Sequence, residues 1–109
     1  MPRATPLPAG LFPAGGEYET VAVSQTDQAL GVAGGVGDFL RSLICVVATS
    51  ATSAVSIKDG AGPAISVLPA LVGGGVGTYV IELNLVSLSG AWSVTTGAGV
   101  TVIATGDFS

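Results

Sequence analysis

The side chains able to act as acids or bases in this 109-residue chain are its carboxylates, because it contains no histidine. The absence of histidine removes the commonest general base, the commonest metal ligand and every Ser-His or Cys-His nucleophile pair. Carboxylate chemistry remains, in which one group donates a proton while a second acts as base or nucleophile. The seven candidates are Glu17, Glu19, Asp27, Asp38, Asp59, Glu82 and Asp107.

The positions of these carboxylates favour structural roles. Four of them lie in or beside a glycine-bearing turn, where aspartate caps backbone N–H groups: Asp27, Asp38, Asp59 and Asp107. Glu82 lies within a strand pattern and is either a solvated, outward-facing residue or half of an intersubunit ion pair with Arg41. Both alternatives are structural, so the sequence predicts a protein that is not an enzyme.

Motifs for metals, cofactors and reactive thiols are also missing. The glycine clusters at 31–38 and 71–77 neither precede a helix nor carry the Lys-Ser/Thr pair of a phosphate-binding loop. The DGAG turn at Asp59 offers one carboxylate, fewer than calcium needs. Cys45 is the single cysteine, so no intrachain disulfide forms, and its apolar neighbours predict a buried core residue. We expect no metal and no cofactor.

The charge composition excludes further classes of protein. Charged residues make up 9% of the chain, against roughly 25% in a typical soluble domain. The net charge is −4 and the cations are Arg3, Arg41 and Lys58, which is too few for a nucleic-acid-binding patch. A surface so poor in charge favours burial against other subunits or another protein.

No segment of the sequence predicts a membrane span or an export signal. The uncharged run at 83–106 is interrupted by polar residues and glycines, among them Asn84, Ser87 and Gly90. The first residues lack a continuous apolar stretch of signal-peptide length. We therefore expect no membrane partner and no signal peptide.

From Tyr18 onward the chain consists of short β-branched runs separated by glycine, aspartate and asparagine, a pattern typical of a sandwich or barrel. We predict an all-β fold: a single-domain antiparallel β-sandwich at 18–109, with Greek-key or jelly-roll wiring. The seven strands expected lie at 18–24, 38–49, 54–58, 64–68, 78–86, 91–96 and 99–108.

Three of these segments carry more specific predictions. The one at 38–49 is apolar on both faces and should be central and covered on both sides: Phe39, Leu43, Cys45 and Val47 on one face, Leu40, Ile44 and Val46 on the other. The segments 54–58 and 64–68 should form a hairpin at a sheet edge, since prolines flank the second. In 78–86, alternation places Tyr79, Ile81, Leu83 and Leu85 in the core.

Residues 1–17 form a separate, extended arm in this interpretation. The segment holds four of the six prolines, which oppose a helix and favour an extended backbone. It also carries Leu7, Leu11 and Phe12, apolar side chains that a solvated tail does not need. We expect the arm to latch onto a neighbouring subunit; the alternative is a flexible tail.

Trp92, the single tryptophan, is a candidate contact residue. Its alternation with Val94 predicts a core or interface anchor. The alternative is an aromatic platform that stacks on a sugar.

The combined pattern resembles small virion proteins of tailed bacteriophages. The residues that carry the resemblance are SQTDQALG (24–31), GDFLRSLICVV (37–47), VSIKDG (55–60) and the terminal GAWSVTTGAGVTVIATGDFS (90–109). The chain looks most like capsid decoration, or cement, proteins. The resemblance lies in overall texture and transfers no functional residue.

This resemblance implies a homotrimer on the capsid surface of a virion, made in the host cytoplasm, that bridges subunits of the major capsid protein. It does not separate this role from a tail-fibre, head-fibre or receptor-binding module that contacts host glycan.

Overall fold

The computed structural model describes residues 17–49, 53–70 and 75–109, which form eight β-strands. Within these ranges no helix is long and apolar enough to cross a membrane. The strands are β1 (Glu17–Val21), β2 (Gln28–Ala29), β3 (Phe39–Val47), β4 (Val55–Asp59), β5 (Ile65–Leu68), β6 (Gly77–Val86), β7 (Trp92–Thr96) and β8 (Val100–Asp107).

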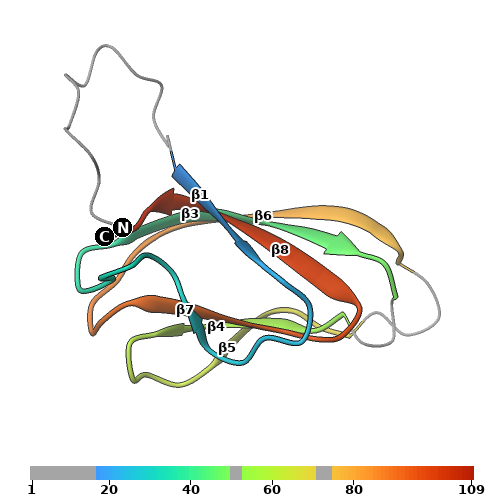
Figure 1. Ribbon diagram of the computed structural model, residues 1–109, viewed down its shortest axis with the longest axis horizontal. Helices are drawn as coiled ribbons and strands as arrows, with labels where there is room; N and C mark the ends of the chain where they lie inside the picture. The colour runs from blue at the N-terminus through green and yellow to red at the C-terminus, as the bar shows by residue number, and fades with distance from the viewer. Residues whose placement is uncertain (1–16, 50–52, 71–74) are drawn as a thin grey trace, which may run out of the picture.

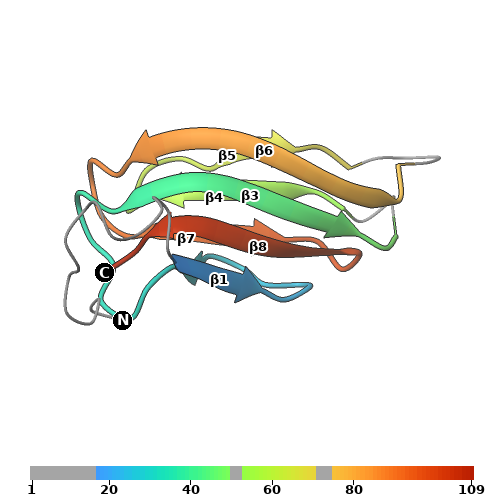
Figure 2. The same cartoon turned by 90° about the horizontal axis from the view of Figure 1, so that it is seen from above.

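The strands form two four-stranded antiparallel sheets packed face to face (Figure 1). Sheet A has the order β1-β8-β3-β6 and sheet B the order β2-β7-β4-β5. Seen from above sheet A, β6, β3, β8 and β1 lie side by side over the strands of sheet B (Figure 2). The predicted all-β sandwich is confirmed.

The strand pairing identifies the wiring of the sandwich. The first strand pairs with the eighth, the second with the seventh, the third with the sixth and the fourth with the fifth. This nested antiparallel pairing is what results when one long hairpin of eight strands is rolled into two sheets, which is a jelly roll. Of the two topologies expected from the sequence, the strand order is that of the jelly roll.

The core lies between the inner faces of the two sheets and consists mainly of β-branched and leucine side chains. Because side chains alternate along a strand, every second residue of β8 is buried there. The buried apolar residues are Val21, Leu30, Leu40, Leu43, Cys45, Val47, Val55, Ile57, Leu68, Trp92, Val94, Val100, Val102, Ala104 and Phe108.

A bulge in β3 places two of its side chains on the faces opposite to those predicted from the sequence. The register of β3 shifts between Leu40 and Ser42 against both of its neighbours. One extra residue reverses the alternation, so Leu40 is buried in the core, whereas Phe39 is only half-buried. The sequence analysis placed Phe39 on the face of Leu43 and Leu40 on the other face. Strict alternation takes no account of an inserted residue, so both residues were assigned to the wrong face.

The expected elements are otherwise found, with two further corrections. The β4–β5 hairpin exists and β5 is an edge strand. The described residues form eight strands, whereas seven were predicted: the short β2 lies between the predicted strands 18–24 and 38–49. β6 is an edge strand, and of its four predicted core residues Leu85 is exposed while the other three are half-buried against the core.

The bulge leads to a prediction at Gly106 of β8. A Cβ added to Gly106 would lie 2.0 Å from the carbonyl oxygen of Phe39 and 3.1 Å from the amide nitrogen of Arg41, so the backbones approach too closely for any side chain. We expect Gly106→Ala to lower the free energy of unfolding by about 2 kcal/mol or more, the scale of overpacking in a core. Urea denaturation monitored by Trp92 fluorescence measures this change.

Gly35→Ala is the matched control, since a Cβ there meets no atom within 4 Å. We expect it to leave the unfolding midpoint nearly unchanged. Equal midpoints for the two variants would show that the Phe39 backbone does not constrain Gly106.

Candidate functional site

The structure uses most of the carboxylates considered for chemistry as acceptors for backbone N–H groups. Glu17 accepts the N–H of Phe108 beside the last strand. Glu19 accepts the N–H of Gly31 at 2.8 Å and so ties β1 to the loop that follows β2. A carboxylate that accepts a backbone N–H forms a charge-assisted hydrogen bond and acts as a structural cap.

Asp38 is the most buried of these carboxylates, at the entrance to β3. Its Oδ2 accepts the N–H groups of Gly35 and Ser109, each at 3.1 Å, and its Oδ1 accepts the Ser109 hydroxyl at 2.6 Å. Its backbone carbonyl accepts the indole N–H of Trp92 at 3.0 Å and the N–H of Ser87. Asp38 thus joins three separate chain segments at one end of the sandwich.

Asp59, at the end of β4, has the same role on the surface. Its Oδ2 accepts the N–H of Leu88 at 2.9 Å and its Oδ1 accepts that of Ser89 at 3.1 Å. These donors, with Leu88 the strongest, hold the pKa of Asp59 below its ordinary value of 3.8. The predicted capping role is confirmed for Asp38 and Asp59, although the loop that Asp59 caps is remote in sequence.

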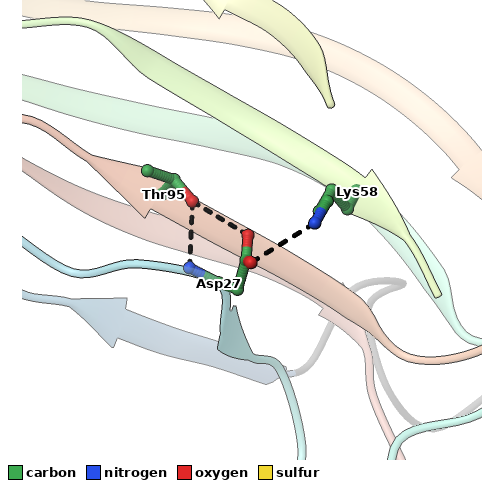
Figure 3. Close-up of polar contacts among 3 residues, drawn as sticks. All are labelled: Asp27, Lys58 and Thr95. Carbon is green, nitrogen blue, oxygen red and sulfur yellow. Dashed lines mark hydrogen bonds and ion pairs between the residues drawn. The ribbon is translucent and has the colours of Figure 1, made fainter. Parts of the chain in front are cut away.

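Asp27 forms a polar cluster across sheet B (Figure 3). The Lys58 ammonium lies 3.3 Å from Asp27 Oδ2, and the Thr95 hydroxyl donates to Asp27 Oδ1 at 3.1 Å. The N–H of Asp27 donates in turn to the Thr95 hydroxyl at 2.9 Å. All three groups are solvent-accessible, so the ion pair contributes at most about 1 kcal/mol and fixes the loop before β2.

Cys45 and Trp92 both belong to the core. Burial raises the pKa of the Cys45 thiol to about 11, which leaves it protonated and unreactive at neutral pH, as expected of a core cysteine. Trp92 is only 3% exposed. The prediction of a core anchor is confirmed, and the buried indole offers no face for a sugar within this subunit.

Of the remaining predicted contact residues, the structure describes Arg41 and Glu82. Arg41 and Glu82 lie on the neighbouring strands β3 and β6 of the same chain, and the Arg41 guanidinium lies 6.0 Å from the Phe39 ring centre. That the two charges form an intersubunit pair stays a prediction. The apolar residues of the arm, Leu7, Leu11 and Phe12, fall outside the described residues.

The outer face of sheet A carries a row of aliphatic side chains, of which Val46 and Val80 are exposed and Ile44 and Ile103 are half-buried. Ile44 of β3 lies opposite Ile103 of β8 and Val80 of β6. Val46 lies two residues after Ile44 in β3 and therefore on the same face. Val80 is 61% exposed and Val46 is 41% exposed. We call these four residues the outer patch. Glu82 is the one charged neighbour on the adjoining row, opposite Ser42.

The outer face of sheet B is chemically different. Ser66 of β5, Ser56 of β4 and Thr95 of β7 form its corresponding cross-strand row. A shallow depression of about 210 Å³ lies over these hydroxyl-bearing residues, and its lining includes no charged or aromatic side chain. A row of hydroxyls is satisfied by water, whereas a row of aliphatic side chains is not.

Sequence reasoning missed two parts of this arrangement. The capping roles of Glu17 and Glu19 depend on segments that the fold brings together. No local sequence pattern predicts them. The outer patch was visible as the second apolar face of the 38–49 segment, but the expected cover for that face is absent from the described chain.

Within the described part of the chain, no group of three or more His, Cys, Asp or Glu side chains is placed to hold a metal ion. Comparisons with protein-family models, with curated proteins and with solved structures find no match.

The hydrogen bonds to the Asp59 carboxylate predict how the free energy of unfolding changes as the pH falls. Because its pKa is lower in the folded chain than in the unfolded one, its contribution is complete above about pH 4 and is lost as the pH falls through the folded value. Asp59→Asn removes this titration. We expect the variant to be less stable than the parent near neutral pH and the difference to shrink below about pH 4.

Urea denaturation at a series of pH values between about 2 and 7 measures the two curves. A constant separation across the whole series would contradict the proposed protonation of Asp59.

Proposed function

We propose that this chain is a structural virion protein that decorates and stabilises a phage capsid, bound across major-capsid-protein subunits as a small oligomer such as a homotrimer. The observation that carries the proposal is the outer patch. A jelly-roll subunit with one aliphatic outer face and one hydroxyl-bearing outer face is suited to burying the first against a protein and leaving the second in water.

The proposal that this protein is not an enzyme is supported by the hydrogen bonds and the ion pair that its carboxylates form. Glu17, Glu19, Asp38 and Asp59 each accept at least one backbone N–H, and Asp27 is engaged by Lys58 and Thr95. A pair of free carboxylates facing a cleft, which hydrolysis of a glycoside would need, is not formed by these five groups.

Stabilisation of a capsid follows from binding alone. A ligand that binds the assembled shell and not its separated subunits stabilises the shell by mass action. Contacts that span subunit boundaries have this property, because they exist only when both neighbours are in place.

The alternative function is a fibre or glycan-binding module. In the sequence analysis the glycan-binding interpretation depended mainly on Trp92. Sugar-binding sites use exposed aromatic rings, and Trp92 is buried. The depression on sheet B has no aromatic lining.

A matched pair of lysine substitutions tests the proposed surface. Val80 and Ser66 are both exposed, and they lie on edge strands of opposite sheets. Burying an unpaired ammonium is unfavourable, so Val80→Lys should weaken capsid binding by about tenfold or more, whereas Ser66→Lys should leave it unchanged. The measurement is co-sedimentation with capsids of the phage that encodes the chain.

Equal binding by the parent and both variants would exclude the outer patch as the contact surface. Quantification of the chain in purified particles then separates the two roles. Many copies spread over the head support decoration, and a few copies confined to the tail or one vertex contradict it.

A further inference from the structure

The strand β6 has one backbone edge that pairs with no described strand. It spans ten residues, Gly77–Val86, and its other edge pairs with β3. In Figure 2 β6 is the outermost ribbon of sheet A. The N–H and C=O groups of alternate residues point away from β3, so this edge can pair with a further strand.

The other three edge strands carry features that oppose pairing with a further strand. β1 has Glu17 and Glu19 on the same face as the buried Val21, and inward-pointing charges on an edge disfavour a neighbour. β5 has four residues, is followed by Pro69 and shifts register against β4. β2 has two residues. Charges, prolines, bulges and short length are the usual means of preventing edge-to-edge association.

These features are absent from the first part of β6. Residues 77–82 pair with β3 in an unbroken register, and they include no proline and no cation. Their one charge is Glu82, at the end of this run. The register shift comes after Glu82 and includes Asn84, whose φ of 54° lies in the left-handed region. Six regular residues of β6 are thus open to pairing.

The inner face of β6 is incompletely covered along the same edge. Tyr79, Ile81 and Leu83 pack against the core but are only half-buried. The edge strand on the same side in sheet B is β5, which has four residues against the ten of β6 (Figure 2). A strand added beside β6 therefore buries apolar surface in addition to pairing backbone groups.

We propose that β6 pairs antiparallel with β6 of a second copy of this chain, about a two-fold axis at Val80. On the inner face this register places Tyr79 opposite Ile81 of the second copy, and pairs of aromatic and β-branched residues across strands are favourable. On the outer face it places Glu82 opposite Thr78 of the second copy, whose hydroxyl can donate to the carboxylate. The interface is self-complementary, as a two-fold contact requires.

The charges of sheet A are compatible with this register. A two-fold axis at Glu82 would place two carboxylates directly opposite each other, whereas an axis at Val80 separates them. Arg41 lies on β3, one strand inside β6, and Asp107 lies on β8, two strands inside. Neither of these groups belongs to the paired edge.

The pairing extends sheet A in its own plane and leaves the outer patch of each copy uncovered. The two patches then lie on one continuous outer face of eight strands. The inference does not rest on the proposed capsid role, which stays a proposal whatever the outcome. It favours a dimer over the homotrimer that the resemblance implies.

Size-exclusion chromatography with light scattering tests the pairing in the full-length protein. We expect a species of twice the chain mass of 10.5 kDa. Tyr79→Lys places a charge on the inner face of the paired edge, so it should raise the dissociation constant of the dimer by about tenfold or more. Ile65→Lys is the matched control, an exposed aliphatic residue on the edge strand β5, and should leave the mass unchanged.

Urea denaturation monitored by Trp92 fluorescence shows whether both lysine variants are folded. A monomeric parent, or equal dissociation by the two folded variants, would overturn the proposal.

Disulfide trapping gives a readout that does not depend on the lysine variants. A residue on the two-fold axis lies opposite itself at a Cα–Cα distance of about 4.5–5.5 Å, within the range of about 4.4–6.8 Å that a disulfide spans. We therefore expect Val80→Cys to form a disulfide-linked dimer on oxidation in air. The native Cys45 is buried and does not compete while the chain is folded.

Ser66→Cys is the control for the trapping, because Ser66 is also exposed but lies on β5. It should give at least about tenfold less linked dimer. Differently tagged chains carrying Thr78→Cys and Glu82→Cys should link to each other and not to themselves, which checks the register. Equal yields from Val80→Cys and Ser66→Cys would contradict the pairing of β6 with itself.

Discussion

The structure depends on one strand, β3, which is apolar on both faces. It lies inside sheet A between β8 and β6, so both of its edges are paired. Its inner residues Leu43, Cys45 and Val47 are buried against sheet B. Its outer residues Ile44 and Val46 are not covered by such a layer among the described residues, and they place an aliphatic row at the centre of the outer face.

Most of the few acidic groups in this chain are used as hydrogen-bond acceptors. With seven acidic groups in 109 residues, most of those described accept hydrogen bonds that fasten loops and chain ends to the sandwich. Charge-assisted bonds of this kind are stronger than neutral ones, and they hold connections that glycine-rich loops would otherwise leave loose. Few charges then remain to keep the outer face of sheet A apart from a second protein.

The sequence was sufficient for the parts of the fold that depend on alternation and turn residues. These included the sandwich and the β4–β5 hairpin. It failed at β2, whose two residues carry no periodicity, and at the bulge beside Arg41, where one inserted residue exchanges the two faces. The caps at Glu17 and Glu19 were also unpredictable, because their donors are brought close only by the tertiary fold.

The central claim is that the outer patch is buried when the protein is in its working assembly. Hydroxyl-radical footprinting of the intact assembly tests it by comparing Val80 with Ile65, two aliphatic residues on edge strands of opposite sheets. Val80 is the more exposed of the two in the isolated subunit, at 61% against 46%. The account predicts that Val80 is oxidised far less than Ile65; oxidation of Val80 at or above the level of Ile65 would contradict it.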